Sequence, residues 1–257
     1  MAPFLSLQNK TALIAGASRG IGLAIARQVA EAGAHTILAS RSLAALEAEA
    51  EALRRAGHQA EARALDTSSR EAILEATKDL PPIDILINVA GTNVRKPFTE
   101  YSVEEYERIM NTNLHGIVTL TQVVGKNMVD RNQGGKIVFI GSLMSLLGLP
   151  YLTVYAMTKS ALAGLTRSLA AEWGKFNIQV NCVAPGFIIT DLNREMWQSE
   201  VLQKWLKGAQ AMPRTGRPED IAPMAAFLSG PGSDYITGQV IAIDGGYTTT
   251  GVWPFEP

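Results

Sequence analysis

The sequence has few of the features that mark several large classes of protein. It holds a single cysteine, Cys182, among its 257 residues, which excludes an intramolecular disulfide framework and any zinc site built from cysteines. The three histidines, His35, His58 and His115, do not have the spacing of metal ligands. Basic and acidic residues nearly balance, at 23 and 24, so the charge indicates neither a nucleic acid nor an anionic membrane as a partner.

Long apolar segments are also missing. No stretch reaches the roughly 18 apolar residues of a membrane span. The first residues, MAPFLSLQNK, lack the basic region and long apolar region of a secretory signal. The sequence therefore predicts a cytoplasmic protein. Its 47% of hydrophobic residues can bury a full core, and no low-complexity linker divides it, so we expect one domain over residues 1–257.

Short segments rich in β-branched residues alternate with longer helical patterns along the chain. We expect strands near residues 11–15, 35–40, 60–66, 83–89, 136–141, 178–183 and 240–243. The two longest helices are expected over residues 102–131 and 152–175. This alternation is typical of an α/β fold of Rossmann type, in which helices cover both faces of a doubly wound, seven-stranded parallel sheet.

One segment, residues 190–217, breaks the alternation by adding helical pattern between the last two strands. It carries Trp197 and Trp205 within a mixed polar pattern. Such a pattern suits a cover over a binding site better than a core helix, so we expect a substrate lid here.

A glycine-rich turn follows the first expected strand. Residues 11–26 read TALIAGASRGIGLAIA, with Gly16, Gly20 and Gly22 in the spacing G-x-x-x-G-x-G. Glycines at such a turn allow the backbone to approach a pyrophosphate at the helix N-terminus, where free amides and the helix dipole favour negative charge. A tight connection alone would also use glycine, but the pattern favours a dinucleotide site.

The end of the second strand indicates which dinucleotide binds. An acidic residue there would accept the ribose hydroxyls of NAD and repel the 2′-phosphate of NADP. Residues 38–42 read LASRS, without an acidic side chain. Arg41 follows the strand and Arg19 lies in the glycine loop, so two guanidinium groups can reach one phosphate. The alternative is a pair of solvated surface arginines. We expect NADP(H) as the cofactor.

Three candidate catalytic residues lie between residues 142 and 159. Tyr155 and Lys159 are one turn apart on an expected helix, and an ammonium group at that distance should lower the pKa of the phenol. Ser142 follows the apolar segment KIVFIG, so we expect its hydroxyl at a strand end, free to hydrogen-bond a carbonyl or alcohol beside Tyr155. The three groups should therefore act on one oxygen.

Taken in order along the chain, these and further motifs resemble those of the short-chain dehydrogenase/reductase family, and the resemblance covers residues 5–250. The matching segments are GASRGIG at 16–22, Asp66, NVAG at 88–91, Asn113 in NTNLHG, Ser142, YAMTK at 155–159 and PGFIIT at 185–190. The resemblance implies that Ser142 orients the substrate oxygen and that Tyr155 is the general acid or base. It also implies that Lys159 binds the nicotinamide ribose, that Asn113 holds a proton-relay water, and that the protein is a homotetramer.

The resemblance also implies residues around the cofactor. Those expected to bind the cofactor are Gly16, Ser18, Arg19, Gly20, Ile21, Gly22, Ser40, Arg41, Asp66, Thr67, Asn88, Ala90, Gly91, Tyr155, Lys159, Pro185, Gly186, Ile188 and Thr190. From the topology, in which ligands bind beyond the carboxyl ends of the strands, those expected to bind the substrate are Arg95, Ser142, Met144, Leu152, Tyr155, Phe187 and Trp197. The alternative is that several of the apolar residues belong to the core and that Arg95 is a surface residue. Two positions depart from the family pattern, Ala15 where threonine is usual and Val89 in place of the second asparagine of NNAG, and neither is a reacting group.

Several functions compete within this resemblance. The segments NVRKPFTEYSVEEYERIMNTN and KWLKGAQAMPRTGRPEDI are similar to gluconate 5-dehydrogenases and related keto-sugar-acid reductases, whereas VFIGSLMSLLGLPYLTVYAMTK is similar to tropinone reductases. A 3-oxoacyl carrier-protein reductase ranks third, because the sequence shows no concentrated basic patch for an acidic carrier. The non-enzyme alternative is a dinucleotide-binding sensor subunit, which could have lost Ser142, Tyr155 or Lys159; all three are present.

The last residues form an apolar tail with Val252, Trp253 and Phe255. Exposed apolar segments of this kind commonly meet a partner. The family resemblance implies that the last strand pairs across a subunit interface and that the tail reaches a neighbouring subunit.

Overall fold

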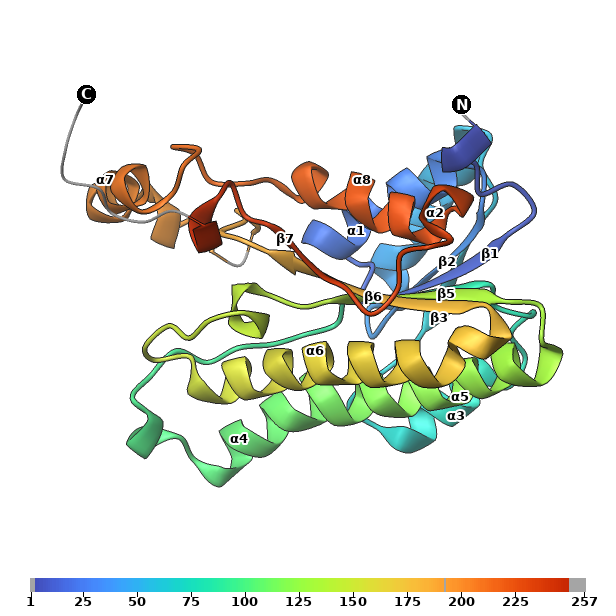
Figure 1. The fold of residues 1–257 in the computed structure, drawn as a ribbon, viewed down its shortest axis with the longest axis horizontal. Coiled ribbons are helices and arrows are strands. Elements are labelled where there is room, and N and C mark those ends of the chain that lie inside the picture. Colours follow the sequence, from blue (N-terminus) through green and yellow to red (C-terminus); the bar gives the residue numbers. More distant parts are fainter. Residues whose placement is uncertain (1–2, 192, 250–257) are drawn as a thin grey trace.

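The computed structural model describes residues 3–191 and 193–249. Within them, a sheet of seven parallel strands has the order β3-β2-β1-β4-β5-β6-β7 (Figure 1). The strands are β1 (Thr11–Ala15), β2 (His35–Ser40), β3 (Ala60–Ala64), β4 (Ile85–Asn88), β5 (Gly135–Ile140), β6 (Ile178–Pro185) and β7 (Val240–Ile243). The apolar tail, with Val252, Trp253 and Phe255, lies outside the described residues.

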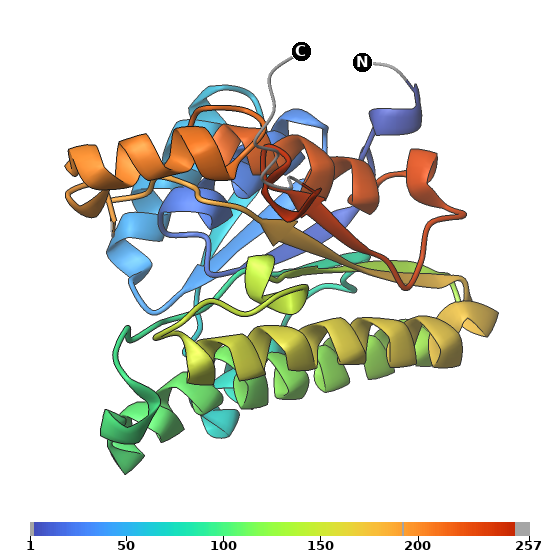
Figure 2. The same cartoon turned by 60° about the vertical axis from the view of Figure 1, so that its left-hand side comes forward.

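Helices form a layer on each face of the sheet (Figures 1 and 2). One layer holds α1 (Gly20–Glu31), α2 (Leu43–Arg55) and α8 (Pro218–Ser229), and the other holds α3 (Arg70–Thr77), α5 (Gly116–Arg131) and α6 (Thr153–Trp173). Successive strand residues point to opposite faces, so Ile14 joins the core under α1 while its neighbour Leu13 joins the core under α5. The expected fold class is confirmed.

The strand positions agree with the sequence-based expectation, but some ends differ. The strand expected over 60–66 ends at Ala64, and the one expected over 178–183 continues to Pro185 with all eight of its residues buried. Both differences lie at the carboxyl edge of the sheet. The segment expected to be a lid contains α7 (Glu200–Ala209), which lies beyond that edge (Figure 1).

The single helix expected over 102–131 is instead interrupted. A π-helical turn, Asn111–His115, separates α4 (Val103–Met110) from α5. Such a turn accommodates one extra residue and commonly marks a functional position. Here Asn113, in the middle of the turn, is fully buried between the two helices and the sheet edge.

The strand order places a topological switch point between β1 and β4. The chain leaves β1 toward β2 and β3, and leaves β4 toward β5, so the loops after β1 and β4 diverge and leave room for a ligand at the carboxyl edge. These two loops begin in close contact: Gly16 has φ +99°, and a Cβ on it would lie 2.6 Å from the Ala90 amide nitrogen. The expected cofactor residues of both loops therefore meet at the switch point.

One close approach predicts a large loss of stability on substitution. A Cβ on Gly116, the first residue of α5, would lie 1.5 Å from the Thr67 carbonyl oxygen. We expect Gly116→Ala to lower the free energy of unfolding by about 3 kcal/mol, because backbone on both sides must move. Gly208→Ala is the control, since a Cβ there has no atom within 4 Å. Chemical denaturation that gave the two variants equal stability would contradict this expectation.

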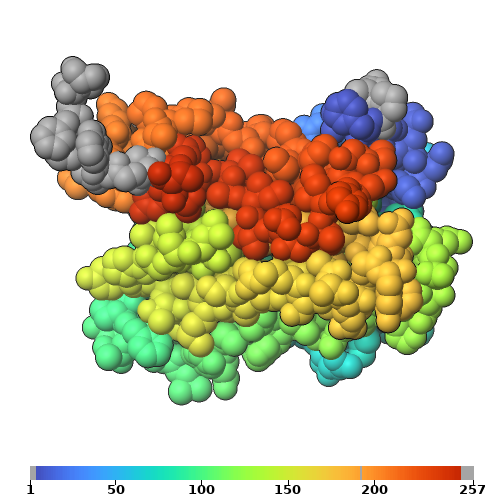
Figure 3. Space-filling model, in the orientation of Figure 1, coloured from blue at the N-terminus to red at the C-terminus, as the bar shows by residue number. Residues whose placement is uncertain are grey.

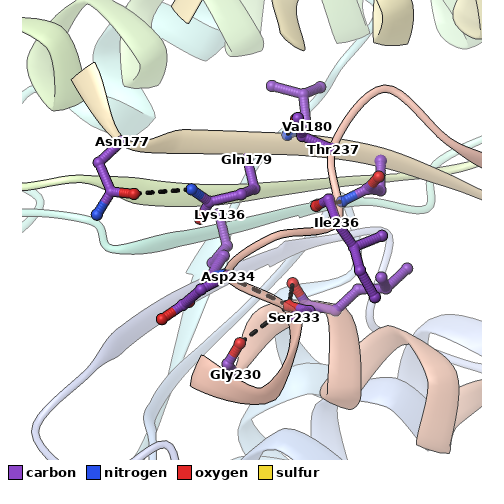
Figure 4. Close-up of polar contacts among 11 residues, drawn as sticks. Lys136, Asn177, Gln179, Val180, Gly230, Ser233, Asp234, Ile236 and Thr237 are labelled. Carbon is purple, nitrogen blue, oxygen red and sulfur yellow. Dashed lines mark hydrogen bonds and ion pairs between the residues drawn. The ribbon is translucent and has the colours of Figure 1, made fainter. Parts of the chain in front are cut away.

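A polar network fixes the edge strand β7 on the side of the sheet away from the switch point (Figure 4). Lys136 on β5 donates to the Asp234 carboxylate at 2.7 Å, and its side chain is only 11% exposed. The Val180 amide donates to Thr237 Oγ1 at 3.0 Å. Burial lowers the pKa of Lys136, and Asp234 opposes that shift. The segment before β7 is thus tied to two inner strands, which fixes where β7 ends at the carboxyl edge.

Candidate active site

The carboxyl edge brings Ser142, Tyr155 and Lys159 together from two elements. Ser142 follows β5 in extended backbone, while Tyr155 and Lys159 lie one turn apart on α6. The Ser142 side chain lies close enough to the Tyr155 phenol to lower its pKa. The Lys159 Nζ lies 5.6 Å from the centre of the Tyr155 ring. A serine hydroxyl, a phenol and an ammonium group therefore line one corner of the cleft, which is the set needed to hold and protonate a carbonyl oxygen.

Lys159 is buried beneath the other two groups. Its side chain is 3% exposed, and its Nζ donates to the Ile140 carbonyl oxygen at 2.7 Å. Burial lowers the pKa of Lys159 to about 8. The Cys182 thiol lies nearby on β6, and burial raises its pKa, so the thiol stays neutral beside the amine.

The expected fall in the pKa of Tyr155 is wrong for this structure. The side chain is only partly exposed, and removal of water from around the phenol raises its pKa, while the hydrogen bond with Ser142 opposes that rise. Lys159 directs its Nζ to the Ile140 carbonyl oxygen. Burial also lowers the pKa of Lys159, so a smaller share of the amine is protonated. Tyr155 is therefore protonated at neutral pH, which is the form that can give a proton.

Asn113 is held by the loop that follows β4. Its Oδ1 accepts from the Thr92 amide at 2.7 Å, and its Nδ2 donates to the Thr92 carbonyl oxygen at 2.8 Å and to Thr158 Oγ1 at 3.3 Å. A Cβ on Gly91 would lie 3.6 Å from Asn113 Oδ1 and 3.7 Å from Lys159 Nζ. The asparagine thus connects the loop after β4 with α6, next to the lysine.

The glycine loop after β1 has the shape of an anion cradle. Gly16 and Gly20 have φ values of +99° and +55°, and a Cβ on Gly22 would lie 2.0 Å from the Gly16 carbonyl oxygen. No side chain caps the N-terminus of α1 at Arg19, so the first amides of the helix are available to an anion. A Cβ on Gly20 would lie 3.3 Å from Thr190 Cγ2, which places Thr190 across the loop. These features fit the pyrophosphate of a dinucleotide.

Arg19 lies in the glycine loop and Arg41 directly after β2, and both are exposed. Arg41 lies close enough to Asp66 to favour its carboxylate. Partial burial raises the pKa of Asp66, but hydrogen bonds from Ser68 and the charge of Arg41 bring it below its ordinary value. Neither arginine has a hydrogen bond or ion pair at contact distance in the described residues, so both guanidinium groups can turn toward a ligand.

The other expected cofactor residues follow the ends of the strands. In the described chain, Asn88 Oδ1 is buried at the end of β4 without a hydrogen-bond partner, as is common where a ligand or water completes a site. Around the cleft lie Ser18, Ile21, Ser40, Thr67, Ala90, Gly91, Pro185, Gly186 and Ile188, in or just beyond the glycine loop and β2, β3, β4 and β6. The carboxyl edge therefore gathers all of the residues expected to bind cofactor.

A family model described as enoyl-(acyl carrier protein) reductase matches residues 16–248. The chain belongs to the short-chain dehydrogenase/reductase family. It is 40% identical over 251 residues to a tropinone reductase homologue of Arabidopsis thaliana, covering 96% of this chain and 95% of the relative. It is 34% identical over 249 residues to gluconate 5-dehydrogenase of Gluconobacter oxydans, covering 95% and 97%.

The fold of this short-chain dehydrogenase/reductase is also that of a solved relative. A crystal structure of gluconate 5-dehydrogenase from Burkholderia cenocepacia, in complex with NADP and tartrate, matches with a TM-score of 0.91 at 34% sequence identity. The match covers 97% of this chain and 99% of that one. The matches to these relatives and to this structure each cover at least 95% of the chain.

The substrate side of this short-chain dehydrogenase/reductase has mostly apolar walls. Met144 and Leu152 are buried in one cluster with Tyr155 and Phe187. Trp197, which is 5% exposed, packs edge-on against Phe187 with ring centres 5.5 Å apart, and Trp205 packs against the same ring at 5.3 Å. The expected lid is thus anchored on Phe187, next to the catalytic corner.

Tyr247 completes this aromatic group and was not among the expected site residues. Its ring lies 4.9 Å from that of Phe187 and 6.0 Å from that of Trp205. In the space-filling view, the red end of the described chain lies against the yellow-green segment that follows β5 (Figure 3). The sequence did carry a signal, because Tyr247 follows the last strand at the same edge of the sheet.

Arg95 lies outside the apolar cluster. It is exposed on the loop after β4, and its Nη1 donates to Met196 Sδ at 2.8 Å. A thioether is a weak acceptor for a guanidinium group. Arg95 therefore links the loop after β4 to the segment expected to be a lid, and its other donors have no partner among the residues that the structure describes.

Proposed function

We propose that the protein is an NADP(H)-dependent oxidoreductase that interconverts a carbonyl and a secondary alcohol. The observation that carries the proposal is the corner formed by Ser142, Tyr155 and Lys159 at the switch point, beside the glycine cradle. The nicotinamide, when bound, supplies or accepts the hydride. A sensor subunit without chemistry has no need for a phenol and a serine hydroxyl directed at one point.

In this proposal each residue has one task. Ser142 donates a hydrogen bond to the substrate oxygen, and Tyr155 gives that oxygen a proton during reduction or removes it during oxidation. Lys159, with a pKa of about 8, lies beside the Tyr155 ring and holds a ribose hydroxyl of the cofactor. Asn113 holds the loop after β4 against α6 and passes protons through a bound water molecule.

Two classes of substrate are compatible with the residues expected to contact it, which are a cation, Arg95, and an apolar cluster. The unused donors of Arg95 suit the carboxylate of a keto-sugar acid, since guanidinium groups bind carboxylates with forked hydrogen bonds. The apolar cluster around Met144, Leu152 and Phe187 instead suits a less polar ketone of the tropinone type. The similarity to gluconate 5-dehydrogenases in sequence and in structure supports the keto-sugar acid as the first choice.

The test is NADPH consumption with 5-keto-D-gluconate, tropinone and a 3-oxoacyl thioester as separate substrates. The proposal expects reduction of 5-keto-D-gluconate at the highest kcat/KM. Higher kcat/KM with tropinone would favour the second class, and higher kcat/KM with the thioester the carrier-protein class. Absence of turnover with every carbonyl, together with tight NADPH binding, would support the sensor subunit.

We further infer that residues 190–217 close over the substrate after the cofactor binds. Trp205 is 41% exposed on α7, so closure should change its surroundings more than those of the buried Trp197. We expect tryptophan fluorescence to change on addition of NADP+ and to change again with gluconate, and Trp205→Phe to remove most of the signal. Trp173→Phe, on α6, is the control. Fluorescence that did not respond to either ligand would contradict lid closure.

The proposed assembly is a homotetramer. The edge strand β7 is built from Val240, Ile241, Ala242 and Ile243, all half-exposed, and apolar edges of this kind pair with another chain. Light scattering is expected to give four times the mass of one chain at micromolar concentration. A stable monomer there would refute the assembly. Among the described helices none is long and apolar enough to cross a membrane, and a cytoplasmic location stays a prediction from the sequence.

A further inference from the structure

One side chain that belongs to none of the recognised motifs contacts the backbones of two candidate catalytic residues. Ser145 closes the short turn after Ser142. Its hydroxyl accepts a hydrogen bond from the Ser142 amide at 3.3 Å and donates one to the Lys159 carbonyl oxygen at 2.9 Å. A single oxygen atom thus bridges the strand end that carries Ser142 and the helix that carries Tyr155 and Lys159.

Close packing fixes the position of this hydroxyl. A Cβ on Gly141 would lie 2.6 Å from Ser145 Oγ and 2.6 Å from Cys182 Sγ, so the missing side chain at Gly141 makes room for both. The Cys182 thiol, fully buried on β6, lies close to the Ser145 hydroxyl and donates to the Val183 carbonyl oxygen at 3.7 Å. In addition, the Ser145 amide donates to the Ser142 carbonyl oxygen at 2.8 Å. The bridge therefore has little freedom to move.

We propose that Ser145 is a positioning residue, which keeps the Ser142 hydroxyl in hydrogen-bonding geometry with Tyr155 by tying Ser142 to Lys159. The inference rests on the proposed function, because it concerns the same catalytic corner. Without the Ser145 hydroxyl, the Ser142 amide loses its acceptor and the strand end can drift from α6. Hydrogen bonds weaken steeply with angle, and small misplacements of reacting groups slow a reaction.

A second serine provides a matched comparison. Ser160, next to Lys159 on α6, donates its hydroxyl to the Met144 carbonyl oxygen at 2.9 Å. It ties the same turn to the same helix, with a bond of the same length, but contacts neither Ser142 nor Lys159 through that hydroxyl. Loss of Ser160 Oγ should therefore loosen the turn without displacing Ser142.

The proposal predicts a change in the titration of Tyr155. The Ser142 hydrogen bond opposes the rise in the Tyr155 pKa that burial causes, so weakening it should raise that pKa further. The other titratable groups facing the corner, in the part of the chain that the structure describes, are Lys159 on the same helix and Cys182 on β6. Burial already raises the pKa of Cys182, and Ser145 opposes that rise, so loss of the Ser145 hydroxyl keeps the thiol neutral.

The experiment compares Ser145→Ala, Ser145→Thr and Ser160→Ala with the wild type, using NADPH and the probe ketone that the wild type reduces fastest. Ser145→Ala is expected to lower kcat about tenfold with an unchanged KM for NADPH, and to move the Tyr155 limb of the pH profile to higher pH. Ser145→Thr keeps a hydroxyl and should restore most of the activity. Ser160→Ala should keep the wild-type profile.

A readout without substrate separates this inference from the proposed function. The ultraviolet difference spectrum between each protein and its Tyr155→Phe counterpart follows the ionisation of Tyr155 alone. An unchanged Tyr155 titration in folded Ser145→Ala, or an equal shift in Ser160→Ala, would overturn the positioning role. If Ser145→Ala does not fold, Ser145→Cys, with similar size and a weaker hydrogen bond, is measured in the same way. A wild type inactive toward all ketones would refute the proposed function only.

Discussion

Replacing Tyr155 with phenylalanine is expected to reduce kcat by about 10²–10⁴-fold, because the proton donor to the substrate oxygen is lost while the ring and its packing remain. The phenylalanine keeps the apolar contacts of the cluster that contains Met144 and Leu152. Binding of NADPH, followed by quenching of protein fluorescence, should therefore stay close to that of the wild type. Steady-state kinetics with the preferred ketone measure the loss.

Tyr151→Phe is the matched control for this substitution. Tyr151 is 56% exposed on the loop before α6, and among the described residues its hydroxyl has no partner, while its backbone carbonyl accepts from the Lys96 amide at 3.1 Å. Removal of its hydroxyl should leave kcat unchanged. If Tyr155→Phe retained near wild-type turnover, or if both variants lost activity equally, Tyr155 would not be the acid or base.

The preference for NADPH over NADH is the second large expected effect. Arg19 and Arg41 are exposed, and their guanidinium groups have no hydrogen-bond partners in the described residues, so each can bond the 2′-phosphate. A charge-assisted hydrogen bond contributes roughly 1.5–3 kcal/mol, and two of them favour NADPH by about two to four orders of magnitude. Salt screening reduces this value at an exposed rim. The double variant Arg19→Ala, Arg41→Ala should lose most of the discrimination.

Arg27→Ala, about two turns along α1 from the glycine loop, is the control for that charge change, because the Arg27 guanidinium pairs with Glu49 at 2.7 Å. It should keep the wild-type ratio of kcat/KM for the two cofactors. Ser40→Asp, at the end of β2, should shift preference toward NADH by repelling the phosphate and accepting a ribose hydroxyl. Equal kcat/KM for both cofactors in the wild type would show that the arginines do not select the cofactor.

Much of the fold could be predicted from the sequence because its elements are strongly patterned. The seven strands were expected within a few residues of their positions, since buried β-branched segments carry a local signal. The π-helical turn at Asn113 was not, because the bonds that hold it come from Thr92 and Thr158, which are distant in sequence. A helix interruption that distant contacts cause does not change the hydrophobic periodicity of the sequence, so it cannot be predicted from that periodicity.

The candidate site could likewise be predicted from the sequence only in part. Motif spacing was enough to bring Ser142, Tyr155 and Lys159 to one corner, because all three follow from the order of strands and the turn of a helix. The direction of the Tyr155 pKa could not be predicted, since it depends on how much water the neighbouring groups exclude. The contacts of Ser145 could not be predicted either, because its two partners, Ser142 and Lys159, come together only in the folded chain.

The π-helical turn between α4 and α5 also constrains how many residues this part of the chain can hold. Each residue of an α-helix accounts for about 100° of rotation, so removing one residue from the turn would rotate α4 about its axis by that angle relative to α5. Ile109, which is 0% exposed, would then leave its place in the interior. The length of the stretch from Ser102 to Gly116 is therefore under as strict a constraint as the identity of Asn113 within it.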